Sequence, residues 1–475
     1  MKRKTITELL LAVTLALAAS VTAVASAAAS SASLLAPANP PKVSLVDFRE
    51  NTSLRIDTQS NIKTEKPVSI KEWEGADEVE WKAAKGVTKK NWPAIYVQNT
   101  KMLLEAQFEL TAEAKEFIEK GIKGAVTITG ELTLAGKAVV FEKVLSEKEI
   151  QEQAKTKTFV TTGVIASNVA VPARVQLYEK AAIKWRWKGT EAGGLEFSQA
   201  LGESQHNIFT TFAKLRASIT APTDIYFTLL YLTAKGIAEK KQLPSELEVI
   251  EGDWTPFKGR EMHAINYDLA TGEIKETATV MTYYKNVALE TLEKEVLNGL
   301  SCNNTTVESL VEKKEGQCNT WAEAFPYTLA YEGIASEKYS VETKFGGPTE
   351  CEAELACFFI VKNWEFEGAG AGEKPFPYFT KEIKDLEGLP GQGTKNPDSI
   401  FIRHFIDKVK GVKETLYDPS YGVGPLEAAT KEEVFLKYQE ESMAGYCVEK
   451  APIKCQKAEA KPQKKKLIEA EISKF

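Results

Sequence analysis

Three side chains in the C-terminal half of the chain could form a nucleophilic site, and the first of them is the thiol of Cys318. Apolar residues at helical spacing follow this cysteine, which predicts that it stands at a helix N-terminus. Backbone N–H groups and the helix dipole at such a position favour the thiolate and can stabilise an oxyanion. Cys318 is therefore a candidate nucleophile, and a structural or disulfide-bonded cysteine is the alternative. Pro326 predicts that the helix is kinked or ends early.

The other two side chains belong to His404 and Asp418, which lie in two apolar segments separated by Lys-Gly. A hairpin centred on Gly411 would place His404 directly opposite Asp418, because both lie seven residues from that glycine. Directly opposed residues share a face of the sheet with their Cβ atoms about 5 Å apart, which suits a carboxylate that orients an imidazole. Asp407 would face the other way. The alternative is a histidine that only satisfies a hydrogen bond in the core.

Together these residues resemble the transglutaminase-like superfamily, a branch of the papain-like thiol enzymes, over roughly residues 285–425. The resemblance rests on the Gly-Gln-Cys motif that ends at Cys318, on His404 within a strand, and on the Tyr-Asp-Pro-Ser motif around Asp418. The order Cys, His, Asp along the chain matches that family. The sequence departs from it at Asn319, where many members have Trp, and in the long segment between the cysteine and the histidine.

The resemblance implies a papain-like α+β domain in which Cys318 attacks a carboxamide or peptide carbonyl and forms a thioester. His404 would take the thiol proton and return it to the departing amine, while Asp418 orients the imidazole. Gln317 and the backbone N–H of Cys318 would bind the oxyanion, and Trp321 would contribute to substrate binding. Attack by water gives hydrolysis and attack by an amine gives cross-linking, and both outcomes use the same residues. No cofactor is implied.

Earlier in the chain, period-two alternation predicts an antiparallel β-sandwich of immunoglobulin-like type. Ile183, Trp185 and Trp187 should point into its core, whereas the lysines and arginine between them should face solvent. Helical patterns are expected at residues 111–120, 229–237, 289–300 and around a capping box formed by Thr305 and Glu308. Short strands are expected at residues 358–361 and 400–406.

The domain organisation predicted from these patterns begins with a signal peptide over residues 1–27 and a flexible leader over residues 28–41. The β-sandwich would span residues 42–195, the transglutaminase-like domain with a helical lead-in residues 196–445, and a C-terminal extension residues 446–475, which is expected to be solvated from about Lys457. The signal peptide implies a secreted or periplasmic protein, and an uncleaved membrane anchor is the alternative. No later segment is apolar enough to predict a transmembrane helix.

The composition limits the class of partner. The chain has 475 residues, 60 Lys and Arg against 66 Asp and Glu, and a net charge of −6. Removal of the predicted signal peptide takes away three positive charges and one negative charge, which changes −6 to −8. A net negative charge argues against a nucleic-acid partner.

The other cysteines would form disulfides in an oxidising compartment. Cys447 with Cys455, and Cys351 with Cys357, are plausible local pairs, and Cys302 is either left over or exchanges partners with one of these. The sequence has no Cys-x-x-Cys motif and no histidine in ligand spacing, so no metal site is expected. The two remaining histidines, His206 and His263, are expected to be surface or hydrogen-bonded residues.

Two classes of function follow. The first is a secreted thiol enzyme, either an acyltransferase or a protease or amidase, whose substrate is a protein or peptide amide, with a cell-wall peptide as one possibility. The second is a non-catalytic secreted or cell-surface binding protein with a relic transglutaminase-like domain. The presence of Cys318, His404 and Asp418 together favours the enzyme.

Overall fold

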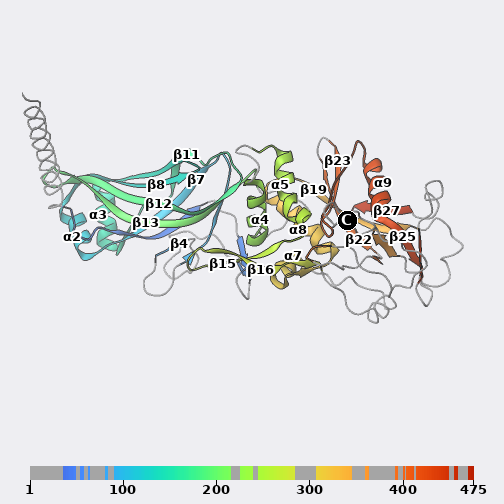
Figure 1. Ribbon diagram of the computed structural model, residues 1–475. Coiled ribbons are helices and arrows are strands. Elements are labelled where there is room, and N and C mark those ends of the chain that lie inside the picture. The colour runs from blue at the N-terminus through green and yellow to red at the C-terminus, as the bar shows by residue number, and fades with distance from the viewer. Residues whose placement is uncertain are drawn as a thin grey trace, which may run out of the picture.

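The computed structural model describes residues 36–49, 54–57, 62–64, 81–83, 90–214, 225–238, 244–283, 306–344, 359–362, 391–393, 400–401, 403–410, 413–448, 454–457 and 469–474. The described part is a mixed α+β chain with a large curled sheet, smaller sheets and seven helices. In Figure 1 the large sheet lies at one end of an elongated molecule and the C-terminal strands lie at the other. The predicted signal peptide and the helix expected at residues 289–300 lie outside the described residues.

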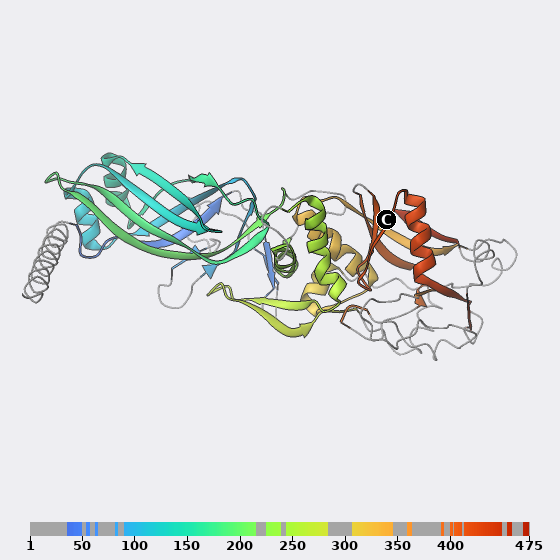
Figure 2. The ribbon, with the colours of Figure 1, turned by 45° about the horizontal axis from the view of Figure 1, so that its top comes forward.

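The large sheet has eleven strands, and apart from the parallel pair β13–β6 its strands are antiparallel. Sheets of more than about ten strands curl or split, and this one is a single hydrogen-bonded sheet that curls (Figure 2). The mixed α+β class is confirmed, whereas the immunoglobulin-like arrangement is not. The strands are β1 (Lys42–Arg49), β4 (Trp81–Lys82), β5 (Lys90–Asn91), β6 (Ala94–Val97), β7 (Lys101–Glu109), β8 (Ile122–Leu134), β9 (Lys137–Leu145), β10 (Phe159–Thr161), β11 (Ile165–Ala170), β12 (Gln176–Glu191) and β13 (Glu196–Thr211).

The alternation predicted in β12 is confirmed. Ile183, Trp185 and Trp187 are buried in the core of the curled sheet, and the charged residues between them are exposed. Two helices, α2 (Ala112–Lys120) and α3 (Glu147–Thr156), add apolar side chains to the same core. Because β12 and β13 pair along nearly their whole length, the boundary predicted at residue 195 falls in the turn between them. The sheet therefore extends to the end of β13.

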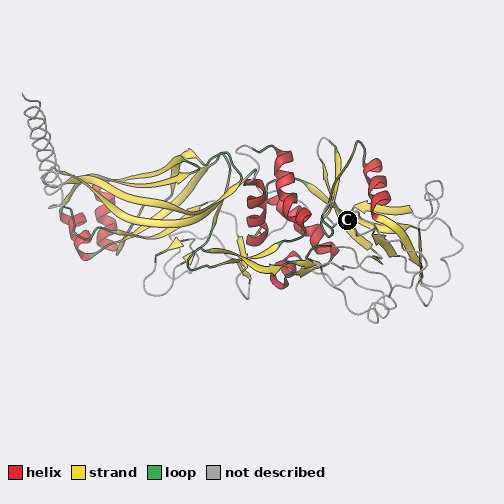
Figure 3. Cartoon of the chain, viewed as in Figure 1, coloured by secondary structure: helices red, strands yellow, loops and turns green. Residues whose placement is uncertain are grey.

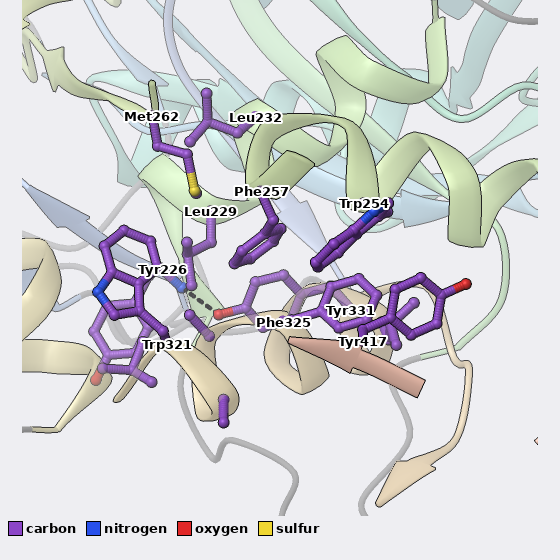
Figure 4. Packing of buried hydrophobic residues seen from close by; sticks show 14 of the residues in the cluster. Tyr226, Leu229, Leu232, Trp254, Phe257, Met262, Trp321, Phe325, Tyr331 and Tyr417 are labelled. Carbon is purple, nitrogen blue, oxygen red and sulfur yellow. Dashed lines mark hydrogen bonds between the residues drawn. The ribbon is translucent and has the colours of Figure 1, made fainter. Parts of the chain in front are cut away.

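A layer of helices separates the curled sheet from the C-terminal strands (Figure 3). It contains α4 (Phe227–Ala238), α5 (Glu246–Gly259) and α8 (Cys318–Tyr331), which bury their apolar side chains in one core. Figure 4 shows the aromatic rings that join α5 and α8 to strand β23 (Glu414–Asp418), where the ring centroids of Phe325 and Tyr417 are 5.0 Å apart. Next to this layer lie β2 (Leu54–Asp57), β3 (Ile62–Thr64), β14 (Ile225–Tyr226), β15 (His263–Tyr267) and β16 (Ile274–Val280).

A five-stranded sheet forms the C-terminal part, in the order β24-β23-β22-β19-β27. Its last strand, β27 (Glu469–Lys474), pairs with β19 (Ser336–Lys344), so the end of the chain belongs to this sheet. The prediction that the tail is wholly a solvated extension is therefore wrong for these residues. The other elements here are α9 (Lys431–Ser442), β20 (Phe359–Lys362), β21 (Ile400–Phe401), β22 (Arg403–Lys410), β24 (Val423–Ala428), β25 (Met443–Val448) and β26 (Lys454–Lys457).

Local predictions differ from the structure at three places. Helix α8 continues to Tyr331, past Pro326, and the residues of its last turn are buried, so tertiary packing stabilises the helix beyond the proline. The N-cap of α7 (Val307–Lys313) is Thr306, whose hydroxyl accepts from the backbone N–H of Ser309, so the capping box with Thr305 is wrong. The strand expected at residues 400–406 is split between β21 and β22, which belong to different sheets.

No helix in the described residues is both long and apolar enough to span a bilayer.

Candidate active site

Cys318 is the first residue of α8, as its sequence context predicts. Gln317 is the N-cap in extended conformation, and its side chain makes no capping hydrogen bond. Cys318 is a thiol with 7% of its surface exposed, and it belongs to the core that surrounds α8. The candidate nucleophile therefore stands where a helix N-terminus favours negative charge.

Trp321 lies one turn into α8, and its side chain is completely buried. Its indole Nε1 donates to the carbonyl oxygen of Gly316 at 3.1 Å. Gly316 ends β18 (Glu315–Gly316), which pairs with β17 (Thr282–Tyr283). The Trp321 ring therefore packs in the core and is hydrogen-bonded to the strand before Cys318, and its contact with a substrate stays a prediction.

His404 and Asp418 are brought together, as the sequence predicts. The His404 Nε2 atom lies 2.9 Å from the Asp418 Oδ2 atom, and both side chains are buried. An ionised carboxylate can only accept, so Nε2 donates and Nδ1 becomes the nitrogen that can exchange a proton with a thiol.

The register of the hairpin differs from the prediction. Lys410 pairs with Glu414, and Asp407 pairs with Tyr417, so the hairpin is centred on position 412 instead of Gly411. His404 is therefore diagonal to Asp418 and not directly opposite it. The contact survives because moving the centre by one residue shifts each pairing by two positions, which keeps both side chains on one face.

A second donor fixes the same carboxylate. The hydroxyl of Tyr438, on α9, donates to the Asp418 Oδ2 atom at 2.8 Å. Burial is the main cause that raises the pKa of Tyr438, and the neighbouring Asp418 raises it further. The phenol therefore keeps its proton and remains a donor, and one buried oxygen receives hydrogen bonds from two side chains.

Asp407 lies three positions from His404 in β22, so strand alternation directs it to the opposite face, as predicted. It is the register partner of Lys338 in β19, whose ammonium is 2.8 Å from the Glu323 carboxylate. Burial is the largest cause that raises the pKa of Asp407 well above its usual range, and Lys338 opposes this effect. The neutral form of Asp407 adds no second negative charge close to Asp418.

A chain of contacts connects the histidine with the cysteine. The ring of Tyr421 lies 5.7 Å from the ring of His404 and 6.0 Å from the ring of Tyr283, measured between centroids. Tyr283 is the register partner of Gly316, two residues before Cys318. Helix α8 also packs against β22 itself. The fold thus assembles the helix that begins at Cys318 and the strand that carries His404 in one core, with Asp418 beside the imidazole.

Sequence analysis did not identify Tyr438 or Tyr421 as parts of this region. Tyr421 directly follows the Asp-Pro-Ser motif, and this position in the sequence indicates that it lies close to Asp418. Tyr438 lies twenty residues after Asp418 in a helix of mixed polarity, and no motif marks it.

The other histidines are hydrogen-bonded. His206 is completely buried with Nε2 at 2.8 Å from the Ser204 hydroxyl, and the Nδ1 of His263 lies 2.9 Å from the carbonyl oxygen of Thr277. The described residues contain no group of three His, Cys, Asp or Glu side chains that could hold a metal ion.

The backbone places Cys447 opposite Cys455 across β25 and β26, and a disulfide between them remains a prediction. Cys302, Cys351 and Cys357 lie outside the described residues.

No protein-family model matches this sequence, and no curated protein matches it either.

Proposed function

We propose that this chain is a thiol enzyme of transglutaminase-like type that forms a thioester between Cys318 and the acyl group of a protein or peptide amide. The observation that carries the proposal is the buried hydrogen bond between His404 and Asp418, in the same core as a thiol at the N-terminus of α8. A carboxylate beside an imidazole stabilises the protonated ring that forms when a thiol gives up its proton.

The reaction begins when the His404 Nδ1 atom takes the thiol proton and the Cys318 sulfur forms a bond to the carbonyl carbon. The oxyanion that results would be held by backbone N–H groups in the first turn of α8 and by the Gln317 side chain. The carbon–nitrogen bond then breaks, and the amine leaves with the proton from His404. Water or a second amine attacks the thioester, gives the acid or the new amide, and restores the thiol.

The finer features of the sequence interpretation belong to this proposal. They are a papain-like arrangement of the C-terminal domain, an immunoglobulin-like arrangement of the N-terminal strands, and secretion directed by the signal peptide. The curled sheet would dock the substrate or a partner. Secretion would bring the enzyme to extracellular or cell-wall amides.

The experiment tests thioester formation and its fate. Purified protein is incubated with a glutamine-containing protein and a labelled amine, and ammonia release and amine incorporation are measured. Incorporation indicates transfer, and ammonia release alone indicates hydrolysis. Cys318→Ala should abolish both, and it should also abolish acylation by an activated ester. Acylation of this variant at the wild-type rate would contradict the proposal, and inertness of the wild type toward every acyl substrate would favour the binding protein.

A further inference from the structure

A buried amide side chain, Gln392, lies between the two parts of the candidate site. It is completely buried, in a short described segment that covers residues 391–393. Its Nε2 atom donates to two backbone carbonyl oxygens, that of Phe257 at 2.7 Å and that of Pro419 at 2.6 Å. A primary amide has two N–H donors, and this geometry uses both of them.

The backbone of Gln392 makes two more hydrogen bonds. Its N–H donates to the carbonyl oxygen of Ser420 at 3.1 Å, and its carbonyl oxygen accepts from the N–H of Tyr283 at 2.6 Å. The partners of this one residue therefore belong to three different elements, which are the end of α5, strand β17 and the turn after β23.

Two of these three elements lead directly to the candidate catalytic residues. Pro419 and Ser420 immediately follow Asp418 in the chain, so their carbonyl groups define where β23 ends. Tyr283 pairs with Gly316, and Cys318 begins α8 two residues later. Gln392 thus joins the segment that carries the carboxylate to the strand that leads into the cysteine.

The third element, α5, connects Gln392 to the buried core around α8. Phe257 is a buried residue of α5, and its ring lies 5.2 Å from the ring of Phe325 in α8. The next residue, Gly393, has a positive φ of 59° and donates to the carbonyl oxygen of Arg260 at 2.8 Å. A Cβ atom there would lie 2.6 Å from the carbonyl oxygen of Met281, so the backbone is closely enclosed at this point.

The geometry points to Gln392 as a positioning residue that holds the Asp418 turn and the strand before Cys318 at a fixed separation. This inference rests on the proposed function, since positioning matters only if Cys318 and His404 exchange a proton. Proton transfer requires the donor and acceptor at hydrogen-bond distance, so a small displacement of either segment reduces its rate.

The test replaces Gln392 with methionine, which has a similar length and no N–H donors. The readout is the rate of iodoacetamide alkylation at Cys318 as a function of pH, measured by peptide mass spectrometry. In the wild type, proton transfer to His404 should keep the thiol reactive at about pH 6, well below the ordinary thiol pKa of about 8.5. In Gln392→Met the rate at about pH 6 should fall by roughly tenfold or more, while the rate above about pH 9 should change little.

The matched control is Asn207→Leu. Asn207 is another completely buried amide, whose Nδ2 donates to the Tyr267 hydroxyl at 3.0 Å and to the carbonyl oxygen of Gly272 at 2.7 Å. It lies at the junction of β13 and β15, away from the candidate site. This variant should lower the melting temperature as Gln392→Met does and leave the alkylation profile of Cys318 unchanged.

Gln392→Asn provides a milder variant that keeps the amide but is too short to reach both carbonyl groups. A folded Gln392→Asn or Gln392→Met protein with the wild-type pH profile would overturn the inference and leave the proposed function intact. An ordinary thiol profile in the wild type itself would overturn the proposed function, and the positioning role with it. An unchanged Asn207→Leu profile beside an altered Gln392 profile would support the inference.

Discussion

Two buried histidines, His206 in the curled sheet and His404 in the C-terminal sheet, differ in the chemical nature of their hydrogen-bond partner. Both side chains are completely buried and both are hydrogen-bonded through Nε2. The partner of His206 is the hydroxyl of Ser204, and its ring meets the ring of Phe48 at a right angle with 4.9 Å between centroids. The partner of His404 is the carboxylate of Asp418. Only the second histidine has a neighbour that favours a proton on the imidazole.

The surroundings of His206 show what burial alone does to an imidazole. Desolvation lowers the pKa of His206 from 6.5 to about 3, so the ring stays neutral at ordinary pH. A serine hydroxyl can donate or accept, so it does not fix one tautomer. A carboxylate only accepts, and it compensates the charge of an imidazolium. The charge of the partner therefore distinguishes a core histidine from a candidate general base.

The largest effect is expected from substitution of the two histidines, which tests the contrast between them directly. His404→Gln should slow acylation of Cys318 by an activated ester roughly 10²- to 10⁴-fold, because the general base is lost. His206→Gln should leave this rate within about twofold and should lower the free energy of unfolding by about 1–3 kcal/mol. Rates and urea denaturation curves are measured for both variants. A comparable loss of rate in both would contradict a special role of His404.

The next-largest effect is expected when only the negative charge of Asp418, the hydrogen-bond partner of His404, is removed. Asp418→Asn keeps the shape of the side chain and should slow acylation about 10- to 150-fold, corresponding to a charged hydrogen bond of about 1.5–3 kcal/mol. The matched control is Asp407→Asn, since Asp407 is a buried carboxyl whose raised pKa already favours its neutral form. The control should change the rate little. Equal rates for the two variants would show that the carboxylate of Asp418 has no part in acylation.

A smaller effect is expected at the second donor to Asp418. Tyr438→Phe removes one hydrogen bond to the Oδ2 atom, which is worth about 1 kcal/mol, or about a fivefold slower acylation. Tyr339→Phe is the control, because the hydroxyl of Tyr339 donates to Glu337 at 2.8 Å and not to Asp418. Steady-state acylation rates of both variants are compared with the wild type. If Tyr438→Phe is acylated at the wild-type rate, the hydrogen bond from Tyr438 to Asp418 does not contribute to acylation.

The smallest effect on the site is expected at Glu332 and Asp253, two buried carboxyl groups that lie close to each other. Their effect on the pH dependence of stability should nevertheless be clear. Burial raises the pKa of Glu332 from 4.5 to about 8, and burial together with Glu332 raises that of Asp253. Between about pH 4.5 and pH 8 the folded chain holds a proton that the unfolded chain has released. The contribution of this proton to the free energy of unfolding is therefore greatest at the lower pH and falls by up to about 1.4 kcal/mol per pH unit as the pH rises.

Glu332→Gln keeps an acceptor for the N–H of Phe212 and removes this titration. The free energy of unfolding, from urea curves at about pH 5 and about pH 8, should depend less on pH in the variant than in the wild type. Acylation at constant pH should be unchanged. The same slope in both proteins would contradict the protonated state of this buried pair.

Features with local causes could be predicted from the sequence. The helix that begins at Cys318, the alternation in β12 and the shared face of His404 and Asp418 follow from spacing within short segments. The centre of the hairpin lies one residue beyond the predicted Gly411, because the turn residues do not define it. Each pairing is therefore shifted by two positions, and this even shift keeps His404 and Asp418 on one face. The burial of Trp321 could not be predicted from its place near the cysteine, because it depends on packing of α8 against α5, where the rings of Trp321 and Phe257 lie 6.4 Å apart.

The remaining parts depend on contacts between distant segments. Gln392 contacts Phe257, Tyr283 and the turn after Asp418, and none of these contacts leaves a pattern along the chain. Strand β27 completes the sheet through pairing with β19, more than a hundred residues earlier, and its composition suggests a solvated tail. The order of the eleven strands in the curled sheet likewise depends on pairings between segments far apart in the chain, such as β13 with β6.

The pH dependence of Cys318 alkylation in the wild type and in His404→Gln tests the central claim most directly. We expect the wild-type thiol to react at about pH 6 and the reactivity of the variant to shift to higher pH, toward the range of an ordinary thiol at about 8.5. Identical profiles for the two proteins would contradict the claim that His404, supported by Asp418, takes the proton of Cys318.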